Sequence, residues 1–271
     1  LIKFSANALE LPLITQRGCP YSCTFCFDLH GKQVRQRTIN NVLEEIDLNF
    51  NKYQAKNFAI LDEVFTFDRE RTLKFCQEII NSRLSKHINF GCSTRVDLLD
   101  RSLIEKMKEA GFNRIMLGVE SGSETTLSRM NKNININNIR SITECLSQNG
   151  IITHISVIIG YPFETRLDIK KTISFARSLR PDYLSINILF PYPGTDIFKQ
   201  ASRNESVFKQ IAWINFSKNI TVPIDLGMIK EKDLKNYQLL GYLGYYSNPL
   251  RLFSLIRTFG LKKIIRSVLF R

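Results

Sequence analysis

Residues 18–26 read Gly18-Cys19-Pro20-Tyr21-Ser22-Cys23-Thr24-Phe25-Cys26, and this short stretch holds three of the six cysteines in the chain. The cysteines follow the spacing C-x3-C-x2-C. A loop this short can bring three thiolates into one volume, where they need a cation. The next cysteine along the chain is Cys76, so no fourth ligand follows nearby. Three thiolates on a four-iron cluster would leave one iron open to a substrate or cofactor.

Two other readings of clustered cysteines fit this sequence less well. A structural zinc site normally has four ligands, often as two separated pairs, and no second C-x2-C or H-x3-H pair is present. Disulfide frameworks belong to small secreted chains. The spacing therefore favours an iron–sulfur cluster on Cys19, Cys23 and Cys26.

Length and composition limit the possible number of domains and the compartment of the protein. The chain has 271 residues, of which 44% are hydrophobic and 23% charged, enough for one large α/β domain with an appendage. It starts at Leu1 and not at Met, which indicates a fragment or a processed chain. No signal peptide and no apolar run long enough to cross a bilayer is found. With this cysteine usage, a reducing cytoplasm is expected.

The net charge of +13 indicates an anionic partner or surface. Nucleic acid is not the expected partner, because no zinc-finger, RNA-recognition or helix-turn-helix signature is present.

Apolar runs alternate with helical patterns along the chain. The expected strands are 11–15, 58–61, 88–92, 114–119, 151–159 and 183–190. Expected helix starts are Asn41, with Glu44 as capping-box acid, Asp68, Asp100 and Thr165. The buried faces are expected to carry Val42, Leu43, Ile46 and Phe50 in the first helix, Leu73, Cys76, Ile80 and Leu84 in the second, and Ile139, Ile142, Cys145 and Leu146 in a later one.

This alternation predicts a parallel sheet with helical crossovers. From the pattern alone, a doubly wound sheet and a partial barrel both remain open. In either fold, ligands bind at the carboxyl ends of the strands. Polar or turn residues follow every expected strand there: the cysteines, Asp62 with Glu63, Ser93 to Arg95, Glu120 with Ser121, Gly160 to Pro162, and 191–195.

The segment 15–26 resembles the cluster loop of radical S-adenosylmethionine (SAM) enzymes. Further segments resemble one subgroup of that family: 61–66, 93–97, 117–123, 159–162 and 191–195. The resemblance covers about residues 11–200 and implies an α/β fold, a partial (β/α)6 barrel open at one side. It divides the chain into a core at 1–195 and a basic, helical C-terminal extension at 196–271.

The resemblance also implies roles for single residues. Glu63 matches the acid that pairs with the SAM ammonium, and Asp62 lies beside it. Arg95 would bind the SAM carboxylate, and Glu120 and Ser121 the ribose hydroxyls. Gly160 would let the backbone approach the adenine, and Phe25 would lie beside that ring. The alternatives are a surface position for Glu63, an ion pair of Arg95 with Asp97, and a simple turn at Gly160.

The subgroup contains cobalamin-dependent methylases and the anaerobic cyclase of bacteriochlorophyll synthesis. The resemblance implies reductive cleavage of SAM to a 5'-deoxyadenosyl radical, for methylation or hydrogen abstraction on an unreactive carbon. The substrate would be a small or lipid-like molecule, and the electron donor a flavodoxin or ferredoxin. The cobalamin domain that precedes the barrel in the subgroup is absent here, so cobalamin would bind only through a missing N-terminal domain.

Two alternatives remain open at this point. Related enzymes carry out tRNA methylthiolation, but the cluster domain and RNA-binding barrel that they add are not visible in this sequence. A non-enzymatic electron-transfer module would need neither Glu63 nor Arg95. Residues 248–271 predict two short basic helices beginning at Pro249 and divided by Gly260. These helices would cover the barrel or attach it weakly to anionic lipid at the inner face of the membrane.

Overall fold

A parallel sheet of six strands forms the centre of the molecule. The structure, a computed structural model, describes residues 9–202, 229–249 and 251–252. The strands lie side by side in chain order: β1 (Glu10–Leu13), β4 (Asn57–Ile60), β5 (Asn89–Thr94), β6 (Phe112–Glu120), β7 (Ile152–Ile159) and β8 (Tyr183–Ile188). All five pairings are parallel. The six predicted strands and their parallel arrangement are confirmed, with ends that differ by a few residues.

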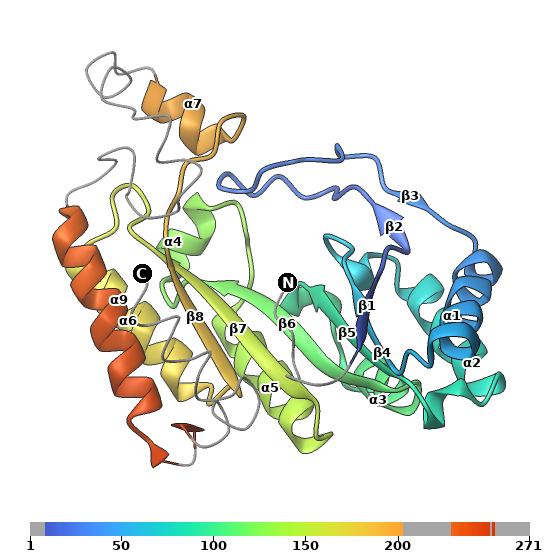
Figure 1. Cartoon of the computed structure of the whole chain (residues 1–271). Helices are drawn as coiled ribbons and strands as arrows, with labels where there is room; N and C mark the ends of the chain where they lie inside the picture. The colour runs from blue at the N-terminus through green and yellow to red at the C-terminus, as the bar shows by residue number, and fades with distance from the viewer. Residues whose placement is uncertain (1–8, 203–228, 250, 253–271) are drawn as a thin grey trace.

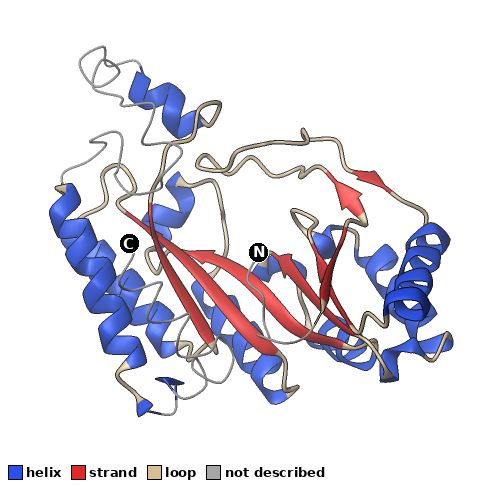
Figure 2. Ribbon diagram, viewed as in Figure 1, coloured by secondary structure: helices blue, strands red, loops and turns tan. Residues whose placement is uncertain are grey.

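Helices connect successive strands and cover one side of the curved sheet (Figures 1 and 2). They are α1 (Ile39–Tyr53), α2 (Arg69–Asn81), α3 (Arg101–Glu109), α5 (Ile136–Gln148) and α6 (Arg166–Ser178). Shorter helices are α4 (Glu124–Arg129), α7 (Asp196–Ser202) and the 3-10 turns η1 (Phe65–Phe67), η2 (Leu84–Lys86) and η3 (Val96–Leu98). With the chain-order sheet, this arrangement matches the predicted open barrel of strand–helix units.

Helix starts follow local capping chemistry. Asp68 and Asp100 accept hydrogen bonds from the main-chain N–H groups of Arg71 and Leu103, as predicted. Thr165 begins α6 with a full capping box to Asp168. The prediction for the first helix was wrong. Thr38 caps α1 and accepts from the N–H of Asn41, so Asn41 lies inside the first turn.

The core between sheet and helices contains four closely packed phenylalanines. Phe65, Phe75, Phe90 and Phe112 have ring centroids 5.1 to 6.3 Å apart. This cluster corrects the predicted face of the second helix. Phe75, Cys76 and Ile79 are fully buried there, whereas Leu73, Ile80 and Leu84 only pack against the core. The large Phe75 ring turns the buried face by one position, because it fills the space between β5 and β6.

The predicted inner faces of α1 and α5 agree with the structure. Val42 and Ile46 are buried in α1, with Leu43 and Phe50 partly buried against the core. In α5 the predicted set Ile139, Ile142, Cys145 and Leu146 is buried throughout. These positions follow the helical period, so the sequence could identify them.

A small antiparallel hairpin, β2 (Gln16–Arg17) with β3 (Arg35–Gln36), carries the cysteine segment between its strands. The sequence analysis did not predict it, because its strands have two residues each and no apolar alternation. From this hairpin the segment crosses over the sheet towards α4 and α7 (Figure 1).

Helix α9 (Glu231–Tyr246) packs on α6 and along β8, the last strand of the sheet. Its Tyr242 hydroxyl accepts from the Ile186 N–H at 2.9 Å, and its Tyr246 hydroxyl accepts from the Leu184 N–H at 3.1 Å. Gln238 donates to the Ile186 carbonyl at 2.6 Å. Side chains spaced one helical turn apart therefore satisfy polar groups on a strand edge that no other described strand pairs with.

The predicted second helix of the tail, beyond Gly260, lies outside the described residues. In the ranges that are described, no helix has the length and apolar character needed to cross a membrane.

Candidate active site

The cysteine loop closes on itself through glycine and main-chain hydrogen bonds. Gly18 has φ +98°, and a side chain there would collide with the Gln33 carbonyl in the segment before β3. The Cys19 N–H donates to the Gly31 carbonyl at 3.1 Å, and the Cys26 N–H donates to the Cys23 carbonyl at 3.1 Å. The loop therefore begins and ends at the β2–β3 hairpin.

The far end of the loop is held by the turn after α4, which the sequence analysis missed. The Thr24 N–H donates to the Met130 carbonyl at 3.1 Å, and the Asn131 side chain donates to the Ser22 carbonyl at 2.9 Å. The Tyr161 hydroxyl shares a 2.7 Å hydrogen bond with Thr24 Oγ1. Asn131 and Asn133 both have positive φ, at 54° and 47°. Their tolerance of this conformation was the available signal for a tight turn.

All three thiols of the loop are free, and they affect one another's ionisation. Burial raises the pKa of Cys26 to about 11, and repulsion from the thiolates of Cys23 and Cys19 is a smaller cause in the same direction. Burial is also the main cause that raises the pKa of Cys19. Since thiolates are the ligands of metals, a bound cation would offset this repulsion and displace the protons.

Within the ranges described, no group of three or more His, Cys, Asp or Glu side chains is arranged to hold a single metal ion. An iron–sulfur cluster makes a different demand, because each cysteine binds a different iron at a corner of the cluster. Three free thiols in one anchored loop fit that donor set.

Glu63 lies next to the loop, at the end of β4. Its Oε2 accepts the Gly18 N–H at 3.3 Å, and its Oε1 shares a short hydrogen bond with His30 Nδ1. The carboxylate is partly exposed, with 31% of the side-chain surface accessible. His30 was not predicted as a site residue, because nothing in the spacing of the sequence links it to Glu63.

Asp62 is directed into the protein. Its oxygens accept hydrogen bonds from the N–H and hydroxyl of Thr15 and from the N–H of Gln16. Burial raises its pKa, against the lowering effect of these hydrogen bonds. Asp62 therefore fixes the chain between β1 and the cysteine loop, and a contact with a cofactor stays a prediction.

Arg95 approaches the loop from the end of β5. Its NH1 lies 3.6 Å from the Cys23 sulfur, and its guanidinium stacks on the Tyr21 ring at 3.9 Å. It also forms two 3.0 Å hydrogen bonds with Asp97, which is the alternative that the sequence left open. The side chain is 8% exposed, so Arg95 is held beside the cysteines by both partners.

Glu120 ends β6 with φ +63° and forms an ion pair with Lys132 at 2.7 Å. Both side chains are buried, with less than a tenth of their surface exposed. Gly118 makes the pair fit, because a Cβ at that position would meet the Glu120 carboxylate and lie 2.8 Å from Lys132 Nζ. Lys132 was not identified from the sequence, in which it is one of many lysines.

The remaining predicted contacts are turned towards the protein. Ser121 has no exposed surface, and its hydroxyl pairs with Thr172 of α6 at 2.9 Å. Gly160 has φ +83° and packs against Leu234 of α9, which a Cβ would approach to 2.8 Å. Phe25 packs against a small cluster of Met130, Tyr161, Leu189 and Ile197. Their contacts with SAM stay predictions.

Glu164 is a further buried acid that the sequence did not single out. Its Oε2 accepts the N–H groups of Gly160 and Tyr161, at 2.7 and 3.1 Å. Burial, only partly offset by these hydrogen bonds, raises its pKa to about 7. The carboxyl group therefore stabilises the turn after β7.

Comparison with known proteins supplies the family. The profile described as the radical SAM superfamily matches residues 13–176. The chain belongs to the radical SAM superfamily. Members of this superfamily are enzymes, and their family chemistry uses a [4Fe–4S] cluster and SAM.

Two curated relatives and one solved structure illustrate the similarity. The chain is 28% identical to an uncharacterized methyltransferase of Pyrococcus horikoshii, over 98% of this chain and 59% of the relative. It is 30% identical to the anaerobic magnesium-protoporphyrin IX monomethyl ester cyclase of Rubrivivax gelatinosus, over 82% of this chain and 40% of the cyclase.

The solved structure of TsrM from Kitasatospora setae, a radical SAM methyltransferase with cobalamin and a [4Fe-4S] cluster bound, has a TM-score of 0.67. It is 16% identical over 72% of this chain and 37% of TsrM, so the likeness concerns the fold. This radical SAM chain thus spans 59% of the first relative and less than half of the second.

Proposed function

We propose that this chain holds a [4Fe–4S] cluster on Cys19, Cys23 and Cys26 and cleaves SAM bound at the open iron. The observation that carries the proposal is the anchored loop with three free thiols, which Glu63 contacts through Gly18 and Arg95 through Cys23. When bound, the cluster supplies the electron that cleaves SAM, and the resulting radical takes hydrogen from an unreactive carbon.

The chain's own residues would bind and orient the cofactor. Glu63 is proposed to accept the SAM ammonium, exchanging its contact with His30 for the ligand. Arg95 offers a buried cation to the carboxylate, and Glu120 an acceptor to the ribose, once Lys132 is drawn aside. Asp62, Ser121, Gly160 and Phe25 are proposed to shape the site.

The proposed substrate is a small or lipid-like molecule, to be methylated, cyclised or otherwise changed by hydrogen abstraction. The sheet face opposite the helices supports this, because neutral side chains lie on it and Arg114, two residues before Met116 on the same strand, forms an ion pair with Glu10. Met116 is 38% exposed there, and Asn187 donates to Ser156 Oγ at 2.9 Å. A wall of this kind suits an uncharged substrate better than a highly charged one.

Anaerobic reconstitution with iron and sulfide tests the proposal. The wild type should bind about four irons and, once reduced, produce 5'-deoxyadenosine or S-adenosylhomocysteine from SAM. Replacing all three cysteines by alanine should abolish the cluster, and Glu63→Ala should weaken SAM binding. Replacement of the buried Cys76 by alanine serves as the control. Equal iron and sulfide binding by the triple variant would show the assignment to be wrong.

We further propose two features that concern the whole protein. Residues 1–195 act as the radical SAM core and 196–271 as a C-terminal extension, and cobalamin use would depend on an additional N-terminal domain. The protein is expected in the cytoplasm, with residues 248–271 attached weakly to anionic lipid. Truncation after Ser247 should then reduce the amount of protein that pellets with anionic vesicles. Equal pelleting of the full chain with neutral and with anionic vesicles would contradict the attachment.

A further inference from the structure

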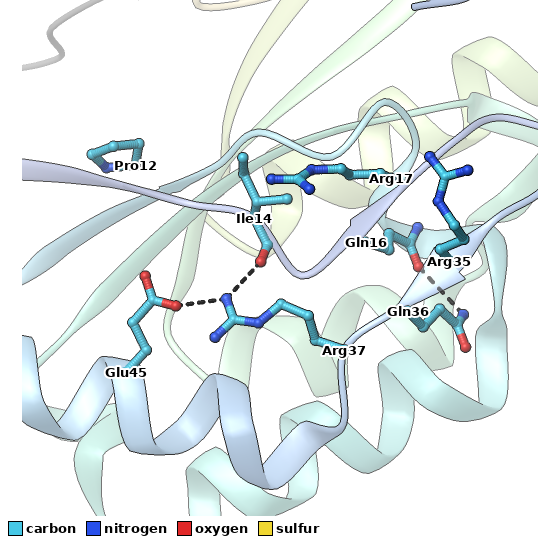
Figure 3. A pocket seen from close by; sticks show the side chains of 8 residues that line it. All are labelled: Pro12, Ile14, Gln16, Arg17, Arg35, Gln36, Arg37 and Glu45. Atoms are coloured by element: carbon cyan, nitrogen blue, oxygen red, sulfur yellow. Dashed lines mark hydrogen bonds and ion pairs between the residues drawn. The ribbon is translucent and has the colours of Figure 1, made fainter. Parts of the chain in front are cut away.

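An open groove lies beside the cysteine loop, between the hairpin, β1 and α1. Its volume is about 610 Å³, and it is lined by Pro12, Ile14, Gln16, Arg17, Arg35, Gln36, Arg37 and Glu45 (Figure 3). Pro12 and Ile14 form an apolar floor, while glutamine and arginine side chains form the sides. The groove follows the outer edge of β1, which has no strand beside it in the described sheet.

Only one of the three arginines in this groove is neutralised. Arg37 forms an ion pair with Glu45 at 2.5 Å and donates to the Ile14 carbonyl at 2.8 Å (Figure 3). The Arg17 guanidinium makes no hydrogen bond or ion pair with any described residue, and the Arg35 guanidinium donates to the His30 carbonyl at 3.0 Å. The lining therefore carries two positive charges without an acidic partner among the residues described.

The backbone places the two uncompensated arginines at opposed positions of the hairpin. Arg17 pairs with Arg35 directly across the two-stranded hairpin, and both side chains are exposed. Like charges in directly opposed positions destabilise a strand pair. A negatively charged group placed over both would remove this repulsion.

The hairpin also links this charge rigidly to the proposed cluster ligands. Arg17 precedes Gly18 and Cys19, and the segment before β3 approaches Gly18 so closely that a Cβ there would collide with the Gln33 carbonyl. The basic groove is therefore connected to the first cysteine by close main-chain contacts, and no long loop lies between them. A partner bound in the groove would be held next to the cysteine loop.

Charge and position together define the partner. Delivery of one electron requires a partner that is oxidised by one electron as the cluster is reduced by one. Encounters of this kind use small, transient interfaces, and complementary charge raises their association rate. A protein with an acidic patch around its redox group matches the exposed arginines, the small groove and the proximity of Cys19.

We infer that the groove around Arg17 and Arg35 is the docking surface for an acidic one-electron carrier protein that reduces the cluster. The inference rests on the proposed function, because a carrier protein is needed only where a cluster is reduced. An acidic side chain of the carrier would lie between the two guanidinium groups, with Ile14 and Pro12 in contact with its apolar rim.

The test follows anaerobic reduction of the reconstituted enzyme by stopped-flow absorption, with two reductants. One is reduced flavodoxin, an acidic protein, and the other is photoreduced 5-deazariboflavin, which is small and uncharged. Arg17→Glu/Arg35→Glu should lower the second-order rate constant for flavodoxin at least tenfold and remove most of its dependence on salt, as expected for lost electrostatic steering. The rate constant for 5-deazariboflavin should not change.

Two further variants make the result specific. Arg17→Gln/Arg35→Gln removes charge without adding any, and should give a smaller loss in the same direction. Arg101→Glu/Arg140→Glu changes the net charge equally but lies on α3 and α5, and its rate constant with flavodoxin should stay within about twofold of the wild type.

Three outcomes would overturn the inference. They are an unchanged flavodoxin rate, an equal loss in the α3–α5 control, and an equal loss with both reductants. Saturable binding of inorganic phosphate that Arg17→Gln/Arg35→Gln abolishes, with flavodoxin reduction intact, would assign the groove to a small anion instead. Failure of the proposed function is separate, because then no cluster forms or SAM is not cleaved even with 5-deazariboflavin.

Discussion

Single residues determine how charge is distributed around the cysteine loop. Glu120 and Lys132 form a buried ion pair whose charges also act on the Cys26 thiol. Glu120 adopts φ +63°, a conformation that costs a non-glycine residue free energy and is found where a side chain has a specific use. The pair thus places two opposite charges beside the cysteine loop. Their burial removes the water that would otherwise hydrate both groups.

Breaking this pair should be more harmful than removing it. Lys132→Ala leaves the Glu120 carboxylate buried without a cation, and we expect it to lower the free energy of unfolding by about 3–5 kcal/mol. The double variant Glu120→Gln/Lys132→Met removes both charges and should lose clearly less. Denaturant unfolding of the cluster-free chain measures both, and equal losses would contradict a charge-based explanation.

Two buried groups should oppose each other in the pH dependence of stability. Burial raises the pKa of Glu164 from 4.5 to about 7, so the folded chain binds this proton more tightly than the unfolded chain. Its contribution is present below pH 4.5 and is lost as the pH rises towards 7. Burial lowers the pKa of His154 from 6.5 to about 4, so its contribution is present above pH 6.5 and is lost on acidification.

Between about pH 5 and 6.5 the two effects should nearly cancel in the wild type, and single variants should reveal each. Glu164→Gln should make the free energy of unfolding fall on acidification, by about 1.4 kcal/mol per pH unit. His154→Gln should make it rise by a similar amount. Urea unfolding at both pH values checks this, and parallel pH profiles for all three proteins would contradict it.

At the scale of elements, capping and periodicity carried most of the information that the sequence offered. Asp68, Asp100 and Thr165 cap helices as predicted, because a cap depends on the chemistry of a few adjacent residues. The face of α2 and the β2–β3 hairpin could not be predicted, since they depend on the Phe75 contacts and on a loop returning to Gly18.

The same distinction applies to the candidate site. The cysteines, Glu63 and Arg95 belong to strand-end segments that a pattern can identify. Other residues of the site come from turns distant in sequence. His30 pairs with Glu63, Lys132 with Glu120, and Asn131 with the cysteine loop, and only the folded chain brings these partners together. Ser121 also belongs to a strand-end segment that the pattern identifies. The pattern does not reveal that its hydroxyl pairs with Thr172 of α6.

Helix α9 provides an element-scale prediction. Tyr242→Phe/Tyr246→Phe keeps the rings but leaves the N–H groups of Ile186 and Leu184 without their acceptors. We expect a loss of about 1–3 kcal/mol per hydroxyl and faster amide hydrogen exchange along β8. Tyr237→Phe, on the same helix, is the matched control and should have little effect. Unchanged exchange at β8 in the double variant would show that the hydroxyls do not protect this edge.

At the scale of the whole molecule, the strands lie in the sheet in the order in which they occur in the chain. Each strand–helix unit can therefore pack on the unit before it, and no later strand has to insert between earlier ones. The number of strands could be predicted from the sequence, whereas the pattern left a doubly wound sheet and a partial barrel both open. The curvature of the sheet and the position of α9 depend on packing among all units.

The anchoring of the cysteine loop by distant residues affects how the protein is made. Thr24 and Ser22 contact residues up to 137 positions later in the chain, at Tyr161 and Asn131. At roughly 5–20 residues per second, the ribosome needs on the order of 7–27 s to synthesise that distance. During this time the three thiols have left the ribosome, but the turn that fixes their loop does not yet exist. Under the proposed function, the cysteines would therefore have to stay reduced during translation, and iron would enter a finished site only after most of the chain has been synthesised.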